Sequence, residues 1–311
     1  MKIGIVTFFN VPNYGAMLQA YALWKHYEAM GHDVEFIDYA FPAANRPSLI
    51  GSFVARSLRG LQIKRRRYRR YEMLDFAKGF PRTRRFKSVD DLRRSCPPYD
   101  CVVVGSDQMW NSVWCSPDYL PVVFLDFVPA GCRRIAYAVS FGDSEWRDVE
   151  TAKTVGGMLC RFDEISVREK SGVRIVKELS GRDAVVCRDP TRLYNAGFYA
   201  DLIAGGAPRT NGNRFVFAHI LDWSKGVREQ SAVRNAFEES GASEVLTAEE
   251  RGHPISVGEW LRRIRDAEVV VTNSYHAMIF AKMFGRNLVP LMLEGPYSMM
   301  NERVLDLLGT I

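Results

Sequence analysis

The stretch VVVTNSYHAMIFAKMFG, residues 269–285, predicts a strand, a turn and a helix within one segment. Residues 269–271 are a β-branched run that is typical of a strand buried on both faces. Polar residues interrupt this run at 272–275, and apolar residues then recur at helical spacing, at Ile279, Phe280, Met283 and Phe284. Gly285 suits the position just past a helix end. A strand followed directly by a helix indicates a parallel α/β sheet.

His276 lies where this strand ends and the helix begins. Open α/β sheets bind ligands at the carboxyl ends of their strands, and the N–H groups that start a helix favour phosphate or carboxylate. A histidine at such a place can donate to an anion or transfer a proton near neutral pH. The alternative interpretation is a histidine that satisfies the turn, and the residue alone leaves both open.

Strand-like and helix-like segments alternate over most of the 311 residues. A strand at 3–8, a helix at about 15–30 and a strand at 34–39 form a βαβ unit. A basic insertion at about 46–94 interrupts the pattern, and residues 203–213 are the best linker candidate because they are rich in Gly, Asn and Pro. We therefore expect an α/β fold of two parallel-sheet domains that face each other, at 1–202 and 203–311.

The composition is that of a soluble globular protein, with 47% apolar and 25% charged residues. We expect no signal peptide and no transmembrane helix, because no apolar run is long enough for either. None of the six cysteines forms a CxxC pair, so we expect reduced thiols, a cytoplasmic protein and no metal site.

The net charge of +6 is unevenly distributed. Residues 56–94 contain fifteen Lys or Arg and four Asp or Glu, and the densest run is 64–70. This run is typical either of a solvated helix face or of a segment that binds an anionic membrane surface, a lipid diphosphate or nucleic acid. No nucleic-acid-binding module is recognisable, so a membrane surface is favoured over RNA or DNA, and a solvated face stays open.

The segment NVPNYGAMLQAYAL, residues 10–23, follows the first strand and begins the first helix. Asn13, Tyr14 and Gly15 lie at the turn, where Gly15 permits close approach of a ligand or of another backbone. Neither GxGxxG nor a P-loop is present, so no motif supports a dinucleotide or a nucleoside triphosphate.

The segment VVVGSDQMWN, residues 102–111, places Ser106, Asp107 and Trp110 after a buried strand. Asp107 could accept a proton from a hydroxyl, and Trp110 could stack on a sugar. The alternatives are a carboxylate that caps a turn and a tryptophan in the core.

Two further strand ends carry charged residues. Arg168, in ISVREKSG, could bind a carboxylate or phosphate with two parallel hydrogen bonds, or could form an ion pair with Glu169 or Asp163. In CRDPT, residues 187–191, a proline follows Asp189, which favours a structural turn.

These segments together resemble, in order and over roughly the entire chain, the polysaccharide pyruvyl transferase family. They are NYGAMLQAYAL, GSDQMWN, SVRE, DPT and EWLRRIRDAEVVVTNSYHAMIFAKMFG. The resemblance implies two Rossmann-like domains facing a cleft in a glycosyltransferase-B-like arrangement. It also implies transfer of pyruvate from phosphoenolpyruvate to a sugar, as a cyclic ketal on a surface glycan or its lipid-linked precursor. His276 and Arg168 match the family's histidine and arginine. Asn273, Tyr275 and Ala277 stand where its pattern has an acid, Phe and Gly.

From this resemblance we expect phosphoenolpyruvate as the co-substrate and no cofactor. His276 would be the acid or the phosphate's proton donor, with Arg168, Asn273 and Ser274 on the donor side. Asp107 would be the base, and the acceptor side would comprise Asn13, Tyr14, Gly15, Ser106 and Trp110. Residues 64–70 would hold the enzyme at the inner membrane face. Two alternatives stay open: a glycosyltransferase that uses a nucleotide sugar, and a non-catalytic glycan-binding protein.

Overall fold

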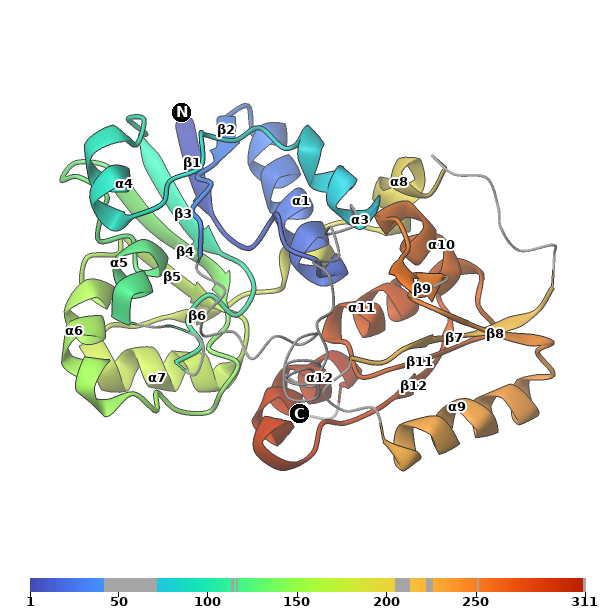
Figure 1. The fold of residues 1–311 in the computed structure, drawn as a ribbon. Helices are drawn as coiled ribbons and strands as arrows, with labels where there is room; N and C mark the ends of the chain where they lie inside the picture. Colours follow the sequence, from blue (N-terminus) through green and yellow to red (C-terminus); the bar gives the residue numbers. More distant parts are fainter. Residues whose placement is uncertain are drawn as a thin grey trace, which may run out of the picture. The chain divides into compact units, whose positions relative to one another are not determined.

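The computed structural model describes residues 1–41, 72–112, 115, 117–204, 213–221, 226–250 and 252–309. The chain divides into two compact units, each built on its own sheet (Figure 1). Unit 1 comprises residues 1–11, 16–45 and 79–193, and unit 2 comprises 12–15, 46–78 and 194–311. This division falls earlier than the boundary expected at 202/203, and it groups the turn at 12–15 with unit 2.

Unit 1 contains a six-stranded sheet in the order β2-β1-β3-β4-β5-β6, and all of its strand pairs are parallel. Its strands are β1 (Lys2–Val6), β2 (Asp33–Phe36), β3 (Cys101–Gly105), β4 (Arg133–Val139), β5 (Glu164–Val167) and β6 (Val185–Val186). Its helices are α1 (Tyr14–Ala29), whose first two residues belong to unit 2, α4 (Val89–Ser95), α5 (Leu120–Val123), α6 (Val149–Leu159) and α7 (Lys170–Ser180). Its short 3₁₀ helices are η3 (Pro117–Tyr119) and η4 (Pro190–Arg192), while η2 (Phe76–Gly79) lies in unit 2 except for Gly79.

The strand order of unit 1 reverses between β1 and β3, which are hydrogen-bonded neighbours with Ile5 opposite Val103. The chain runs from β1 to β2 in one direction across the sheet and from β3 to β6 in the other. Such a reversal is the topological switch point at which open α/β sheets bind ligands, outside the carboxyl ends of the strands. The segment that follows β3, beginning at Ser106, therefore lies at the expected place for a site.

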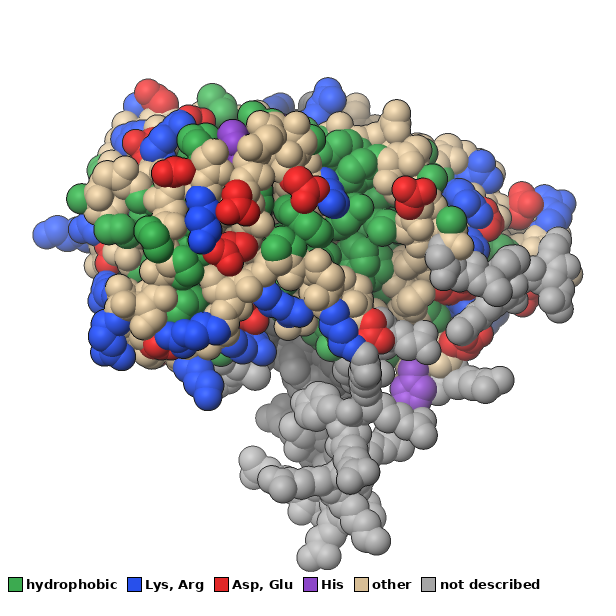
Figure 2. Space-filling model, turned by 90° about the horizontal axis from the view of Figure 1, so that it is seen from above, with side chains coloured by type: hydrophobic (Ala, Val, Ile, Leu, Met, Phe, Trp, Pro, Cys, Tyr) green, Lys and Arg blue, Asp and Glu red, His purple; other side chains and the backbone are tan. Residues whose placement is uncertain are grey.

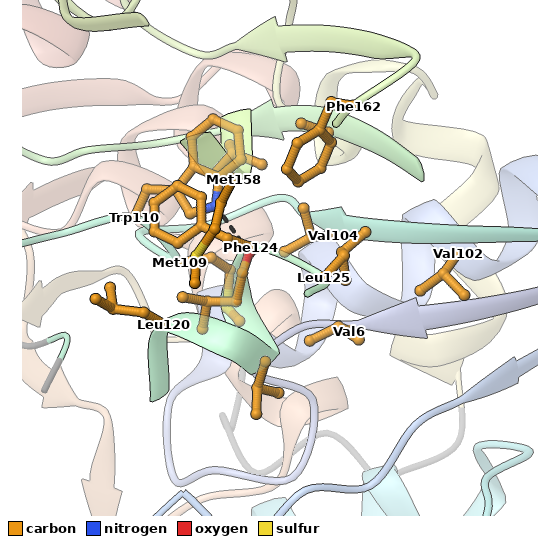
Figure 3. Close-up of a cluster of buried hydrophobic side chains, with 14 of the residues drawn as sticks. Val6, Val102, Val104, Met109, Trp110, Leu120, Phe124, Leu125, Met158 and Phe162 are labelled. Carbon is orange, nitrogen blue, oxygen red and sulfur yellow. Dashed lines mark hydrogen bonds between the residues drawn. The ribbon is translucent and has the colours of Figure 1, made fainter. Parts of the chain in front are cut away.

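The core of unit 1 forms because the buried faces of the strands carry Val and Ile, against which large aromatic side chains pack (Figure 3). Trp110 is fully buried there, stacks on Phe124 at 5.0 Å between ring centroids, and donates its indole N–H to Val123 O at 2.8 Å. This packing positions the turn between β3 and Trp110.

Unit 2 contains a four-stranded parallel sheet in the order β12-β11-β7-β8 and a short antiparallel pair, β9 and β10. Its strands are β7 (Phe215–His219), β8 (Glu244–Thr247), β9 (Glu249–Glu250), β10 (His253–Pro254), β11 (Val269–Thr272) and β12 (Asn287–Pro290). Its helical segments are α3 (Glu72–Asp75), η5 (Ala196–Tyr199), α8 (Ala200–Ala204), α9 (Val227–Ser240), α10 (Val257–Asp266), α11 (Tyr275–Met283), η7 (Gly295–Asn301) and α12 (Glu302–Leu308).

The sheet of unit 2 has the same doubly wound arrangement, and its strand order reverses between β7 and β11. His219, the last residue of β7, is the register partner of Thr272, the last residue of β11. Helix α9 lies on one face of this sheet, and α10 and α11 lie on the other (Figure 1). The stretch 269–285 thus forms β11 and α11, as predicted. Strand β11 ends and helix α11 begins at the switch point.

Some predicted segments are shorter than expected or lie outside the described residues. The strand before CRDPT is only Val185–Val186, because the following residues turn at Asp189 and enter η4. The predicted linker 203–213 lies mostly outside the described residues, as does the basic run 64–70. Within the described ranges, no helix has the length and apolar character needed to cross a membrane.

Candidate functional site

His276 is the second residue of α11 in unit 2, and 8% of its surface is exposed. Ser274 is the N-cap residue of this helix, but its side chain makes no capping hydrogen bond. The first turn of a helix has backbone N–H groups without intrahelical partners, so an anion can bind there. The imidazole is thus placed beside a helix start that the Ser274 side chain does not cap.

Gly15 packs directly against the His276 ring. A Cβ atom added at Gly15 would lie 2.1 Å from His276 Nδ1 and 2.4 Å from its Cγ, far inside van der Waals contact. Only glycine lets the backbone come this close to the imidazole. The first turn of α1 therefore helps to fix the His276 ring, a role that the sequence did not predict for Gly15.

Tyr14, the first residue of α1, anchors this helix start within unit 2. Its ring stacks on Trp260 of α10 at 4.9 Å and 7° between planes, and its hydroxyl is 2.9 Å from Ile255 O and 3.1 Å from Ala248 O. Burial raises the pKa of Tyr14, and the nearby Glu249 carboxylate adds to the effect. The phenol therefore stays a neutral donor to the backbone.

His219 is a second imidazole at the switch point of unit 2. Its ring lies edge-on to Tyr14 at 5.8 Å and to Trp260 at 5.6 Å between centroids. Tyr14, Gly15, His219, Trp260 and His276 are called the imidazole cluster below. Sequence reasoning missed His219, although its place at the end of the strand-like run RFVFAHIL was the same kind of signal as that of His276.

Polar contacts tie the ends of β7 and β11 together. Thr272 Oγ1 donates to His219 O and accepts from Ser274 N, at 3.0 Å for the latter pair. Asn273 is buried, and its Oδ1 accepts from Leu221 N at 2.9 Å. Asn273 thus retains the acceptor oxygen that an acid would offer at this position.

In unit 1, Asp107 lies in the turn that follows β3. Its φ of 66° is in the left-handed region, which Asp tolerates better than most residues. Its backbone O accepts from Met109 N and from Ser140 N, both at 2.8 Å. The Asp107 side chain is 18% exposed, so its carboxylate can reach solvent or a ligand.

Arg168 follows β5, and its side chain is only 1% exposed. Its Nη1 is 2.7 Å from Asp189 Oδ2, its Nη2 is 3.6 Å from Asp107 Oδ1, and its Nε is 4.0 Å from Glu169 Oε2. Asp107, Arg168, Glu169 and Asp189 are called the carboxylate–arginine cluster below. The ion-pair alternative for Arg168 named Glu169 or Asp163, whereas the nearest carboxylate is that of Asp189, which sequence reasoning had assigned only to a turn.

The predicted acceptor residues occupy different environments. Ser106 is fully buried and donates to Ala138 O at 2.8 Å, and Trp110 is fully buried in the core. The burial of Trp110 favours its core alternative, because a covered ring cannot stack on a sugar. Asn13 is exposed, directly before α1. Arg168 lies beside the carboxylates of Asp107, Glu169 and Asp189, and its donor role stays a prediction.

The described part of the basic insertion is extensively ion-paired. Arg84 pairs with Asp91 at 2.6 Å, and Arg85 lies 3.5 Å from Asp38. Figure 2 shows Lys and Arg side chains interspersed with Asp and Glu side chains on one face of the molecule. In the described ranges, no group of three or more His, Cys, Asp or Glu could hold a metal ion.

Comparison with known proteins identifies the chain's relatives. The family model described as polysaccharide pyruvyl transferase matches residues 13–293, which is nearly the whole chain. No curated protein is similar enough to match.

Solved structures with similar folds include enzymes whose names refer to UDP-sugars. UDP-GlcNAc 2-epimerase from Methanocaldococcus jannaschii has 9% identity and a TM-score of 0.51, over 95% of this chain and 85% of that one. The UDP-GlcNAc-bound 2-epimerase from Neisseria meningitidis has 7% identity and a TM-score of 0.50, over 99% and 85%. At such identities the likeness shows the fold alone, two Rossmann-like domains of the glycosyltransferase-B type.

Proposed function

Because the chain belongs to the polysaccharide pyruvyl transferase family, we propose that it transfers pyruvate from phosphoenolpyruvate to two hydroxyls of one sugar. The product is a cyclic ketal on a surface polysaccharide or on its lipid-linked precursor. The observation that carries the proposal is the His276 imidazole in the first turn of α11, at the switch point of unit 2.

The donor needs positive potential and hydrogen-bond donors, since phosphoenolpyruvate carries a carboxylate and a phosphate. The start of α11 offers backbone N–H groups and the positive end of the helix dipole. Arg303 adds a cation at the same end, because its guanidinium lies 5.2 Å from the centroid of Tyr275, the first residue of α11. We assign the donor to this place, with Asn273 and Ser274 shaping the turn beneath it.

The reaction begins with protonation of the methylene carbon C3, which leaves an oxocarbenium-like centre at C2. One sugar hydroxyl adds to C2 and loses its proton, phosphate leaves, and the second hydroxyl adds and loses its proton to close the ketal. The sum is phosphoenolpyruvate plus diol giving ketal plus phosphate. His276 supplies the proton to C3 or to the departing phosphate, and Asp107 accepts a proton from the first hydroxyl. A positioned acid contributes roughly 10²–10⁴-fold to such a step.

A nucleotide-sugar-dependent glycosyltransferase is the second candidate, and the start of α9 argues against it. This helix follows β7 at the switch point, where a diphosphate would be expected to bind. Glu229 Oε2 already accepts from Gly226 N there at 2.8 Å, and Glu294 lies beside the same helix start, paired with Arg228. A diphosphate would meet like charges in this position.

A non-catalytic glycan-binding protein is the third candidate, since Asn273 and Ala277 depart from the family pattern. Asn273 Oδ1 accepts a hydrogen bond from Leu221 N, and Ala277 is fully buried in α11. Both departures are thus accommodated by packing without loss of the imidazole. They favour retained catalysis over a binding-only role.

Thermal denaturation with added ligands tests the three candidates. A ligand that binds only the native state raises the melting temperature, by an amount that grows with its concentration above Kd. We expect phosphoenolpyruvate to stabilise the protein and UDP-sugars to leave it unchanged. A pyruvate-sized mass gain on a lipid-linked oligosaccharide then separates catalysis from binding alone. Stabilisation by UDP-sugars only would contradict the proposal.

We also propose that the basic run 64–70, which lies outside the described residues, holds the protein at an anionic membrane surface. Each Lys or Arg close to such a surface contributes about 1 kcal/mol. Co-sedimentation with phosphatidylserine vesicles should fall when these residues are replaced by Gln. Unchanged co-sedimentation would leave the solvated-face interpretation.

A further inference from the structure

Four aromatic rings contact one another beyond the carboxyl ends of β1, β2 and β3 in unit 1. Phe8 follows β1, Tyr39 and Phe41 follow β2, and Tyr119 is the last residue of η3. The ring centroid of Phe41 lies 5.4 Å from that of Phe8, 5.2 Å from that of Tyr39 and 5.9 Å from that of Tyr119. All three contacts are edge-to-face, an arrangement that aromatic pairs prefer. These four residues are called the aromatic cluster below.

Phe8 and Phe41 are the members of the aromatic cluster that keep a larger exposed surface. Tyr39 and Tyr119 are only 7% and 8% exposed, whereas Phe8 and Phe41 are half-buried and pack against the core of unit 1. Small-molecule sites are lined mostly by apolar and aromatic side chains, with a few polar groups that fix the orientation of the ligand. Phe8 and Phe41 supply the aromatic part of such a lining.

The aromatic cluster adjoins the turn that carries Asp107. Val6 of β1 is the register partner of Val104 of β3, and Thr7 Oγ1 donates to Ser106 O at 3.4 Å. Phe8 and Asp107 are the residues that directly follow this hydrogen bond in the two segments. The switch point between β1 and β3 is therefore bordered by an aromatic ring after one strand and by a carboxylate after the other.

Groups that can bind hydroxyls lie beside the same rings. Burial raises the pKa of Tyr39, and the neighbouring Tyr119 and Asp118 add to the effect. The Tyr39 phenol therefore stays protonated near neutral pH. Asp118, in the middle of η3, is exposed. Aromatic rings next to a phenol and a carboxylate suit a sugar, because a sugar ring has an apolar C–H face and hydroxyls around its rim.

We propose that Phe8 and Phe41 bind the acceptor by stacking on a sugar ring, beside the hydroxyl from which Asp107 takes a proton. The sequence predicted this stacking role for Trp110, whose ring is enclosed in the core. The assignment rests on the proposed function and adds to it the residues that recognise the acceptor.

The lipid part of a lipid-linked acceptor is the other ligand that aromatic side chains could bind. A hydrocarbon chain has no hydrogen-bond donors, so it would leave the carboxylates of Asp107 and Asp118 without a partner from the ligand. A sugar supplies hydroxyl donors to carboxylates and an apolar face to the rings. The surroundings of the aromatic cluster therefore favour the sugar.

Variants of the full chain test this assignment through the KM values for the two substrates. With phosphoenolpyruvate and a lipid-linked oligosaccharide preparation, Phe8→Leu and Phe41→Leu should each raise KM for the oligosaccharide roughly five- to tenfold. KM for phosphoenolpyruvate should not change. Phe8→Tyr and Phe41→Tyr keep the ring, so the rise should be at most about twofold. A purely structural role would lower the urea midpoint without changing the ratio of the two KM values.

Phe198→Leu is the matched control. Phe198 lies in η5 of unit 2, is half-buried, and stacks on Tyr194 at 3.7 Å between ring centroids. The substitution removes an aromatic ring of the same exposure class from a place outside the proposed site. Both KM values should stay at those of the wild type.

Saturation-transfer NMR measures sugar binding without turnover, with the oligosaccharide freed from its lipid by mild acid. The wild type should give sugar signals, and both Leu variants should weaken them. Unchanged oligosaccharide KM in both Leu variants would overturn the proposal, as would equal losses in the Leu and Tyr variants. A raised KM for the lipid-linked oligosaccharide with unchanged NMR signals would also overturn it, in favour of the lipid chain.

Failure of the proposed function has a different signature. A wild type that releases no phosphate from phosphoenolpyruvate with this acceptor would refute pyruvyl transfer. The NMR measurement would still decide whether the aromatic cluster binds sugar, because it needs neither phosphoenolpyruvate nor turnover. Absence of sugar signals with the wild type would overturn the acceptor assignment.

Discussion

The end of β3 in unit 1 and the end of β11 in unit 2 occupy equivalent places in two doubly wound sheets, but different interactions hold the residues that follow them. In unit 1, buried ion pairs centred on Arg168 and Asp189 fix the turn. In unit 2, aromatic stacking and a close glycine contact fix His276.

This difference suits different tasks. The carboxylate–arginine cluster is built from ion pairs and hydrogen bonds between largely buried groups, so it suits holding a turn in one conformation. The imidazole cluster presents a histidine, the side-chain type that most often acts as a general acid or base. Substitutions in the two clusters should therefore fail in different ways, the first mainly in stability and the second mainly in activity.

Replacing Asp189 by Ala should give the largest loss of stability. It leaves the Arg168 guanidinium buried without its closest partner, and breaking a buried pair in this way costs about 3–5 kcal/mol. The free energy of unfolding, measured by urea denaturation, should fall by that amount. Asp183→Ala is the matched control, because Asp183 pairs with Lys177 on the surface at 2.8 Å, and its urea midpoint should hardly change. Equal losses of unfolding free energy in the two variants would mean that the buried Arg168–Asp189 pair stabilises the fold no more than the surface Lys177–Asp183 pair does.

Replacing Gly15 by Ala should impair activity more than stability. The added methyl group must displace the His276 ring, and a misplacement of about 1 Å can reduce turnover roughly 10²-fold. Phosphate release from phosphoenolpyruvate is the measurement. Gly157→Ala in α6 is the control, since an added Cβ there meets nothing within 4 Å. Full activity of Gly15→Ala would show that the contact does not position the imidazole.

Replacing Tyr14 by Phe should have the smallest effect of the three. It keeps the stack on Trp260 and removes only the hydroxyl that donates to backbone oxygen at Ile255 or Ala248. Loss of such a hydrogen bond lowers stability by about 1 kcal/mol. Thermal and urea denaturation measure this directly. A loss several times larger would indicate that the hydroxyl, rather than the ring, organises the turn.

Periodicity and strand-end signals in the sequence predicted much of this arrangement. The run 269–285 gave its strand and helix correctly because β-branched residues and helical spacing are local properties. Asp107 and His276 were proposed from the sequence because each follows a buried strand, and their roles stay predictions. The sequence could not indicate that Arg168 is enclosed, since its partners lie 21 and 61 positions away, at Asp189 and Asp107. Nor could it show that Gly15 touches His276, because that contact depends on tertiary packing.

The most direct test of the central claim, that His276 supplies a proton at the donor, is the rate of phosphate release from phosphoenolpyruvate by His276→Gln with a lipid-linked oligosaccharide as acceptor. We predict a fall of roughly 10²–10⁴-fold relative to the wild type, with the urea midpoint nearly unchanged. Turnover within a few fold of the wild type would contradict the assignment of this imidazole as the acid.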